Sequence, residues 1–372
     1  MMENRNVDWV DWVKFCCIFF VYWNHVGKFS INKDFLSWFY GPFFVNAFFF
    51  ISGYLIFRKQ FSEKEIRLNF IQFWNKNFKY GKGMFPNIVF RIAVPSIIFS
   101  LLLFIPRCII RGEPIEIIYI FKTTLLRGTY WFTCCLFVAE FIIFSLLLTR
   151  IKYMVFYVLF TSILAYLGNY LINLHFLILE DEYLPWFFKS GLIASFFLTL
   201  GGLYQEYEHK IDVFFGYPRR MSYFYSLVLF LCYIITIICR INIHEKTSCL
   251  SGVNIWGISI SLFAILTIVY ICKMMRNYLL VKYISRNTIS FYFLSALVPF
   301  VCCKMVDYIL PISFIAYIVE VLLSFSIALF VVYLLNSFIP FLFDLRILFK
   351  HKYFTNLIQP TGSKDKHGWF KV

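Results

Sequence analysis

This sequence has few charged residues. Only 15% of its 372 residues are Asp, Glu, Lys or Arg, whereas 61% are hydrophobic. Soluble domains carry about 25% charged and about 45–50% apolar residues, so the composition excludes a soluble protein. Acidic residues number 20 against 35 Lys and Arg, which leaves a net charge of +15. In a membrane protein such an excess reports topology rather than nucleic-acid binding.

Several chemical motifs are also missing. There is no GxGxxG or P-loop sequence, which argues against nucleotide binding through those motifs, and no repeat of the kind that marks many transporters. The 11 cysteines lack CxxC or Cys/His metal spacing, so we expect buried thiols and no metal site. Cys239 and Cys249, which bracket an outer loop, are the one pair placed to bridge. No cleavable signal peptide is expected, because Lys14 lies in the middle of the first apolar run.

Long apolar runs are what the sequence has in abundance. Their lengths predict an all-α fold, a polytopic transmembrane helix bundle of about ten spans. The predicted spans are residues 7–27, 36–57, 86–106, 129–149, 153–174, 187–205, 223–241, 253–272, 287–303 and 312–343. The last is long enough to tilt or to kink at Pro340. We therefore predict one transmembrane domain over residues 1–345, followed by a basic tail over 346–372 that is predicted to be disordered.

Lys and Arg concentrate in alternate connecting segments, chiefly residues 58–82, 273–286 and 346–372. Segments rich in positive charge stay in the cytoplasm, so both termini are predicted to be cytoplasmic. Segment 58–82 is partly amphipathic. It suits either an interfacial helix held by anionic lipid or a docking surface for an anionic, phosphate-bearing cofactor. The outer segment 107–128 holds an apolar stretch too short to span, which is expected to lie on the membrane or dip back into it.

The first predicted span carries two ionisable side chains, Lys14 and His25. Eleven residues at about 100° each return both to nearly the same helix face, roughly 16 Å apart along the axis. Ionisable groups inside a bilayer usually mark a pathway or a reaction centre. A neutral imidazole suits general-base work, and Asp11, three residues before Lys14, can pair with it. The alternative is that Lys14 snorkels to the cytoplasmic interface while His25 sits in the outer headgroup layer.

A few other polar residues fall within the predicted spans. Arg91 is expected to be a second buried cation, suited to phosphate recognition or to snorkelling as an anchor. Glu140 and Glu320 are isolated acids that suit either a functional role or a helix–helix hydrogen bond. Ser52 and Gly53 are typical of close helix packing.

The first span, DWVDWVKFCCIFFVYWNH, resembles the opening of the membrane-bound acyltransferase 3 family. Asp11, Lys14 and His25 match its pattern of an acid, a base three positions later and a His after ten more residues. Four further segments resemble the family in order, namely PFFVNAFFFISGYLIF, Arg91–Pro95, Tyr130–Phe132 and SRNTISFYFL at 285–294. The chain departs from the pattern twice: Lys14 replaces the commoner Arg, and Ser295 stands where many relatives have His.

The resemblance implies an acyl-CoA-dependent O-acyltransferase. It would move an acyl group, usually acetyl, from cytosolic acyl-CoA to a sugar hydroxyl on or near the outer side of the bacterial inner membrane. Acetyl-CoA is thus the expected donor, and a cell-surface glycan or lipid-linked oligosaccharide the expected acceptor. Capsule, O-antigen and exopolysaccharide all fit, and the choice between acetyl and succinyl transfer stays open.

The resemblance also assigns roles to residues. The candidate catalytic residues are His25, Lys14 and Asp11. The candidate donor contacts are Lys14, Arg91 and Trp131. The remaining candidates are Ser52, Glu140 and Ser295. In the mechanism we favour, Lys14 and Arg91 orient the CoA end while His25 activates the acceptor hydroxyl; a relay through acyl-His is the variant.

Two other classes of protein fit the same sequence. A carrier or flippase for a lipid-linked or secreted saccharide would use Lys14, Glu140 and Glu320 as charges along its pathway. A structural partner of a polysaccharide export complex would need none of them for chemistry.

Overall fold

A computed structural model describes residues 8–30, 37–61, 68–79, 83–112, 115–178, 185–215, 221–242, 255–276, 278–310 and 313–343. Helices dominate these residues and no strand occurs among them, which confirms the all-α prediction. The predicted tail over 346–372 lies outside the described residues. So does Cys249, while its predicted neighbour Cys239 carries a free thiol.

Five helical segments among the described residues are long and apolar enough to cross a membrane. They are Met84–Leu102, α10 (Trp131–Leu148), the Met154–Ile172 part of α11 (Met154–Ile178), most of α14 (Ile255–Met274) and α18 (Phe314–Phe338). A bent pair, α16 (Thr288–Leu294) and α17 (Leu297–Ile309), makes a sixth if it counts as one span. The total of ten spans and the cytoplasmic termini stay predictions.

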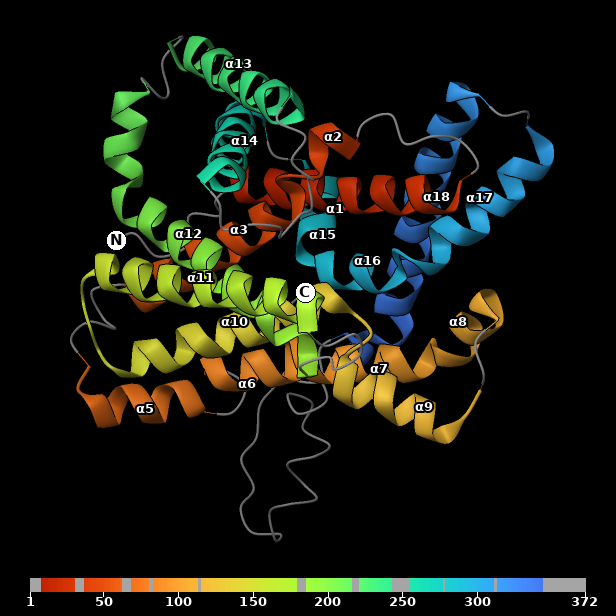
Figure 1. Ribbon diagram of the computed structural model, residues 1–372, viewed down its shortest axis with the longest axis horizontal. Helices are drawn as coiled ribbons and strands as arrows, with labels where there is room; N and C mark the ends of the chain where they lie inside the picture. The colour runs from red at the N-terminus through yellow and green to blue at the C-terminus, as the bar shows by residue number, and fades with distance from the viewer. Residues whose placement is uncertain are drawn as a thin grey trace, which may run out of the picture.

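Helix α1 (Asp8–Phe29) runs through the middle of the bundle (Figure 1). Acidic residues in its first turn and Lys28 in its last turn complement the helix dipole. It contacts α3 (Phe44–Gln60), α14, α15 (Leu279–Arg286), α16, α17 and α18. The helix that carries Lys14 and His25 is therefore enclosed by other helices over most of its length.

Helix α3 packs closely against α12 (Phe188–Phe214), which also contacts α10 and α11. Glycines allow the two backbones to approach. A Cβ on Gly53 would lie 1.8 Å from the Leu198 carbonyl oxygen, and one on Gly201 would lie 1.9 Å from that of Phe50. The close-packing role predicted for Gly53 is confirmed, because only glycine fits at such an approach.

Prolines interrupt two spans that the sequence predicts as continuous. The predicted span 36–57 is α2 (Ser37–Tyr40) and α3, separated by a turn containing Pro42. The predicted span 287–303 bends by 52° between α16 and α17. Pro299 has no amide hydrogen for the Ser295 carbonyl and its ring crowds that group, which explains the break. Helix α17 then continues to Ile309, six residues beyond the predicted end of this span.

The last predicted span also ends earlier than expected. Helix α18 stops at Phe338, and Pro340 begins a short 3₁₀ turn, η4 (Pro340–Leu342). Pro340 therefore lies beyond the end of the helix rather than at a kink inside it.

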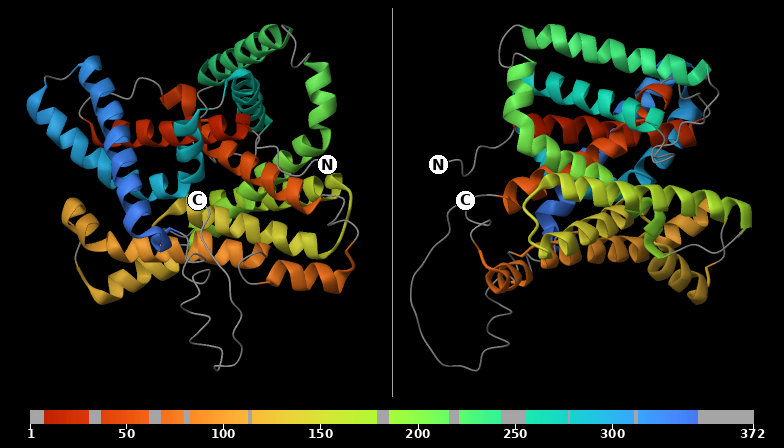
Figure 2. Two further views of the ribbon diagram at one scale, coloured as in Figure 1. Left: turned by 180° about the vertical axis from the view of Figure 1, so that it is seen from behind. Right: turned by 60° about the vertical axis from the view of Figure 1, so that its left-hand side comes forward.

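The two amphipathic connections contain short helices. Within 58–82, α5 (Phe70–Phe78) starts with a capping box formed by Asn69 and Gln72. It is seen end-on in the right panel of Figure 2, where α11 runs across the view. Phe70, Ile71 and Trp74 are exposed on it. Within 107–128 lie the end of α8 (Phe104–Arg111), α9 (Ile117–Phe121) and the π-helical η2 (Lys122–Arg127).

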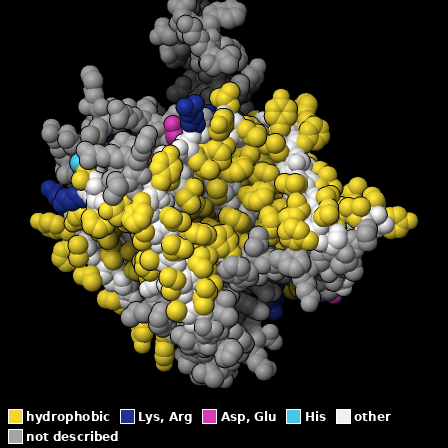
Figure 3. Space-filling view, turned by 90° about the horizontal axis from the view of Figure 1, so that it is seen from above, with side chains coloured by type: hydrophobic (Ala, Val, Ile, Leu, Met, Phe, Trp, Pro, Cys, Tyr) yellow, Lys and Arg dark blue, Asp and Glu magenta, His cyan; other side chains and the backbone are white. Residues whose placement is uncertain are grey.

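Much of the surface is apolar. One face of the molecule is covered by hydrophobic side chains with few charges at its edges (Figure 3). Helix α13 (Met221–Asn242) exposes Leu227, Leu231, Ile235 and Ile238, which recur at helical spacing. Such an extended apolar surface suits lipid contact. The chain is thus a multi-pass membrane protein.

Candidate active site

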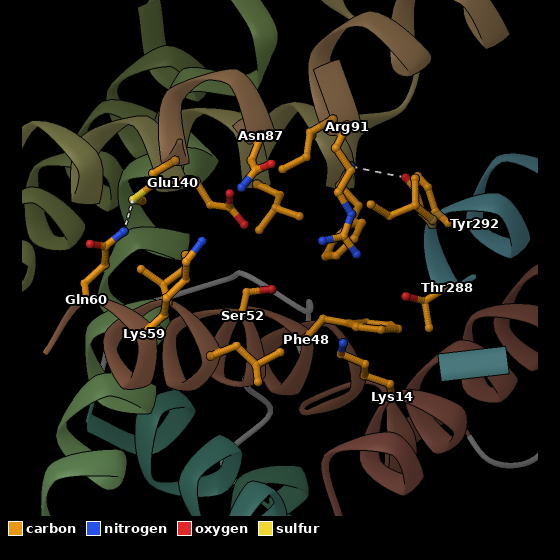
Figure 4. A pocket seen from close by; sticks show the side chains of 17 residues that line it. Lys14, Phe48, Ser52, Lys59, Gln60, Asn87, Arg91, Glu140, Thr288 and Tyr292 are labelled. Carbon is orange, nitrogen blue, oxygen red and sulfur yellow. Dashed lines mark hydrogen bonds between the residues drawn. The ribbon is translucent and has the colours of Figure 1, made fainter. Parts of the chain in front are cut away.

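A cavity of about 260 Å³ lies between α1, α3, α6 (Met84–Ile88), η1 (Val89–Ala93), α10 and α16 (Figure 4). Its lining residues are Lys14, Phe48, Ser52, Leu55, Ile56, Lys59, Gln60, Met84, Asn87, Arg91, Ile92, Phe132, Leu136, Glu140, Thr288, Ile289 and Tyr292. Four candidates chosen from the sequence therefore share one cavity: Lys14, Ser52, Arg91 and Glu140.

The lining is cationic on balance. Lys14, Lys59 and Arg91 face the cavity, together with the single carboxylate of Glu140 (Figure 4). Low-dielectric walls concentrate the field of such charges and favour an anionic ligand. Polar groups from Ser52 and other residues add hydrogen-bonding capacity without changing that balance.

Arg91 is not buried, contrary to the expectation from the sequence. Its side chain is exposed and projects into the cavity, rather than being buried among helices (Figure 4). It lies in the π-helical η1, which continues into α7 (Val94–Leu102). Pro95 cannot donate an amide hydrogen to the Arg91 carbonyl, so a widened turn at this point is expected. The Arg-x-x-x-Pro spacing thus fixes where the guanidinium enters the cavity.

The buried amide of Gln60 links α3 to α5 and α6 beside the cavity. Gln60 Nε2 donates to Asn77 Oδ1 at 3.1 Å and to Met84 Sδ at 3.7 Å. Both Gln60 and Asn77 are buried. Helix α5 is therefore fixed directly to residues that line the cavity.

Asp11 contacts the helix that follows α14. Ser285 Oγ of α15 donates to Asp11 Oδ1 at 2.5 Å. This bond ties the N-terminal half of α1 to α15, one turn before Lys14. The ion pair of Asp11 with Lys14 stays a prediction.

Trp131 and Ser295 lie outside the cavity lining. Trp131 is half-buried at the start of α10, with its ring edge-on to that of Phe132, which does line the cavity. Ser295 is buried at the α16–α17 break, where its Oγ donates to the Tyr292 carbonyl at 2.8 Å. Ser295 therefore ends α16, and the donor contact predicted for Trp131 stays a prediction.

His25 is not among the residues that line the cavity. It lies half-buried near the opposite end of α1 from Asp11, with its ring stacked on Phe29 at 6.2 Å. Its Nδ1 is buried and has no hydrogen-bond partner among the described residues. Phe29 in turn packs on Phe300 of α17. The imidazole therefore faces the α17 side of the bundle, and its predicted role as a base stays a prediction.

Glu320 lies apart from the cavity as well. It is completely buried in α18, and Cys303 Sγ of α17 donates to its Oε2 at 3.9 Å. This helix–helix contact matches the structural alternative given for it from the sequence.

A second polar cluster was not foreseen. Lys273 Nζ lies 2.6 Å from Asp212 Oδ1 and 2.9 Å from Glu208 Oε1, with its side chain only 2% exposed. Tyr54 Oη donates to Glu208 and Tyr270 Oη donates to Asp212. The cluster joins α3, α12 and α14.

Some of the missed cavity residues do carry a sequence signal. Phe48, Ser52, Leu55, Ile56 and Lys59 recur at steps of three and four, so they lie along one face of α3. Lys59 could have been grouped with Ser52 on this basis. Asn87, Thr288 and Tyr292 come from other helices, and no periodicity links those helices to α3.

A family model described as an acyltransferase domain matches residues 7–337. This range includes every residue that lines the cavity, as well as His25. No curated protein and no solved structure matches the chain.

Proposed function

The chain belongs to the acyltransferase 3 family, and from this we propose that it transfers an acetyl or other short acyl group from cytosolic acyl-CoA to a hydroxyl of a cell-surface glycan. Membership of this family supports acyltransferase activity in general. The donor, the acceptor, the bacterial inner membrane as its location and the role of each residue are parts of the proposal.

The cavity is the observation that carries the donor assignment. CoA is polyanionic, and the lining brings three cations from α1, α3 and η1 to one place. Arg91 can form paired hydrogen bonds to phosphate oxygens, whereas Lys14 and Lys59 act as point charges. A volume of about 260 Å³ accommodates the reactive end of the donor rather than the whole of CoA.

His25 is proposed as the general base for the acceptor. It lies on the same helix as Lys14, roughly 16 Å further along the axis, toward the predicted outer side. No described residue hydrogen-bonds to its Nδ1, and a neutral imidazole nitrogen can accept a proton from a hydroxyl. The acyl group would thus approach from the Lys14 end of α1 and the sugar from the other.

Transfer of label from radiolabelled acetyl-CoA into the surface glycan tests the proposal. A deletion strain is complemented with the wild type, with His25→Ala or with His209→Ala, which makes the same change at an exposed position of α12. We expect label in the glycan with the wild type and His209→Ala, and none with His25→Ala at equal protein level in the membrane.

Other outcomes are equally informative. Full labelling with His25→Ala would remove the base mechanism while leaving the acyltransferase. Absence of labelled glycan in the wild type, together with loss of glycan export on deletion, would instead favour the carrier.

A further inference from the structure

We propose that Tyr292 is a further catalytic residue, whose hydroxyl donates a hydrogen bond to the thioester carbonyl oxygen of the donor and stabilises the oxyanion formed from it. This inference rests on the proposed acyl transfer. Tyr292 lines the cationic cavity from α16, opposite residues of α3 (Figure 4).

Helix α16, which carries Tyr292 into the cavity lining, packs alongside α1. Thr288, one turn earlier on α16, lines the cavity with Lys14. The residue before Tyr292, Phe291, accepts a hydrogen bond from Tyr22 Oη at 2.8 Å. Tyr22 lies two turns beyond Lys14 on α1 and one turn before His25. The proposal places the reactive end of the donor between Lys14 and the level of Tyr22, where its carbonyl oxygen comes within reach of Tyr292.

The hydroxyl of Tyr292 has a proton to donate. Its oxygen accepts from the Phe132 backbone N–H at 3.1 Å, in the first turn of α10. Among the described residues we find no acceptor for its own proton. Three other tyrosines already use their proton: Tyr22 and Tyr130 donate to backbone carbonyls, and Tyr54 donates to a carboxylate. A phenol that already accepts a hydrogen bond is also the stronger donor.

The ring is held in place before any substrate binds. Tyr292 is 7% exposed, and its ring packs against those of Tyr130, Phe132 and Phe293. Its carbonyl accepts from Ser295 Oγ, which fixes the end of α16. A donor positioned in this way needs no reorganisation when charge develops on the substrate oxygen.

The acceptor hydroxyl oxygen forms a bond to the thioester carbon while His25 takes its proton. The carbonyl electron pair becomes an oxyanion that Tyr292 stabilises by its O–H, without giving up the proton. The C–S bond then breaks, the C=O bond is restored, and the CoA thiolate receives the proton from His25.

The test is Tyr292→Phe in purified protein reconstituted in vesicles, with acetyl-CoA and the glycan acceptor. Loss of one oxyanion donor lowers kcat by about 100-fold or more, and we expect that loss with the KM for acetyl-CoA unchanged. Equilibrium binding of CoA and the thermal unfolding midpoint should match the wild type, because phenylalanine retains the ring contacts. Tyr22→Phe is the matched control: it removes a buried hydroxyl that already donates to α16, and its kcat should stay within about threefold of wild type.

Two results would overturn the inference. One is a Tyr292→Phe enzyme whose kcat is within twofold of wild type. The other is a parallel loss of CoA binding and thermal stability, which would make Tyr292 a structural residue. An inactive wild-type protein would instead refute the proposed function, so the two failures are distinguishable.

Discussion

Lys14 and Arg91 reach one cavity from different helices (Figure 4). This convergence is the reason to interpret Lys14 as a ligand contact. A single lysine on a membrane helix is equally compatible with snorkelling. Two cations that point into the same polar cavity, with Lys59 beside them, are better explained by an anionic ligand.

Lys14→Met should therefore raise the KM for acetyl-CoA by about tenfold or more, since a charged hydrogen bond contributes about 1.5–3 kcal/mol. Lys14→Arg keeps the charge and adds a second donor, so we expect a KM within about threefold of wild type. Steady-state kinetics on vesicles measures both. An unchanged KM in Lys14→Met would exclude Lys14 as a donor contact.

The ion pairs of Lys273 predict an effect on stability rather than on substrate binding. Replacing it with Met leaves the carboxylates of Glu208 and Asp212 close together without their cation. Removing one partner of a buried ion pair costs about 3 kcal/mol, so the thermal unfolding midpoint in detergent should fall clearly. Lys210→Met, at an exposed position of α12, is the matched control and should leave the midpoint unchanged. Equal midpoints for the two variants would mean that the cluster adds nothing to stability.

At the residue scale, the sequence was informative where a polar side chain stood alone in an apolar run. Lys14, Ser52, Arg91 and Glu140 were all chosen in this way, and all four line the cavity. Local patterns place Lys273 in the connecting segment 273–286 and miss its ion pairs, because its partners lie more than 60 residues away in the sequence.

At the scale of elements, α3 is the helix on which the cavity depends most. One face of it lines the cavity, and another packs against α12 through Gly53 and Gly201. Tyr54 adds a hydrogen bond to Glu208 of α12 at 2.6 Å. The position of Ser52 and Lys59 is thus set by the contact on the far side of the same helix.

Gly53→Ala and Gly201→Ala should each separate α3 from α12. The new Cβ would lie less than 2 Å from a backbone oxygen, so the helices must shift. We expect a loss of about 1–3 kcal/mol in stability and reduced acyl transfer, measured by thermal unfolding and by glycan labelling. Ser145→Ala, on an exposed face of α10, controls for the alanine itself. Wild-type stability in both glycine variants would contradict the observed packing.

The sequence predicts the positions of several helices closely, but it does not predict where helices break. Apolar length places α10, α11, α13 and α14 within a few residues of their predicted bounds. The breaks near Pro42 and Pro299 were missed because hydropathy continues across them. A proline inside an apolar run is compatible with either a kink or a break, and the neighbouring helices decide between them.

At the scale of the whole molecule, the proposal requires two sides with different substrates. In the proposal, the donor is cytosolic and the acceptor glycan lies on or near the outer side. Lys14 and His25 lie eleven residues apart on α1, so the line between them gives the direction in which the acyl group would move from donor to acceptor.

The predicted orientation can be tested by reporter fusions. A phosphatase that is active only outside the cytoplasm, fused after Val372, should be inactive, whereas the same reporter inserted within residues 243–254 should be active. The positive charge of segments 58–82 and 346–372 is the physical reason for this expectation. The reverse pattern would invert the topology and place the cationic cavity on the wrong side for cytosolic CoA.

Sidedness of the reaction itself is the most direct measurement. Sealed inside-out and right-side-out membrane vesicles are supplied with external radiolabelled acetyl-CoA, which does not cross the bilayer, and the glycan inside or outside is then analysed. We predict labelled glycan in the interior of inside-out vesicles, dependent on Lys14 and His25, and none from right-side-out vesicles. Labelling only in right-side-out vesicles, or labelling that persists when both residues are replaced, would contradict transfer through this bundle.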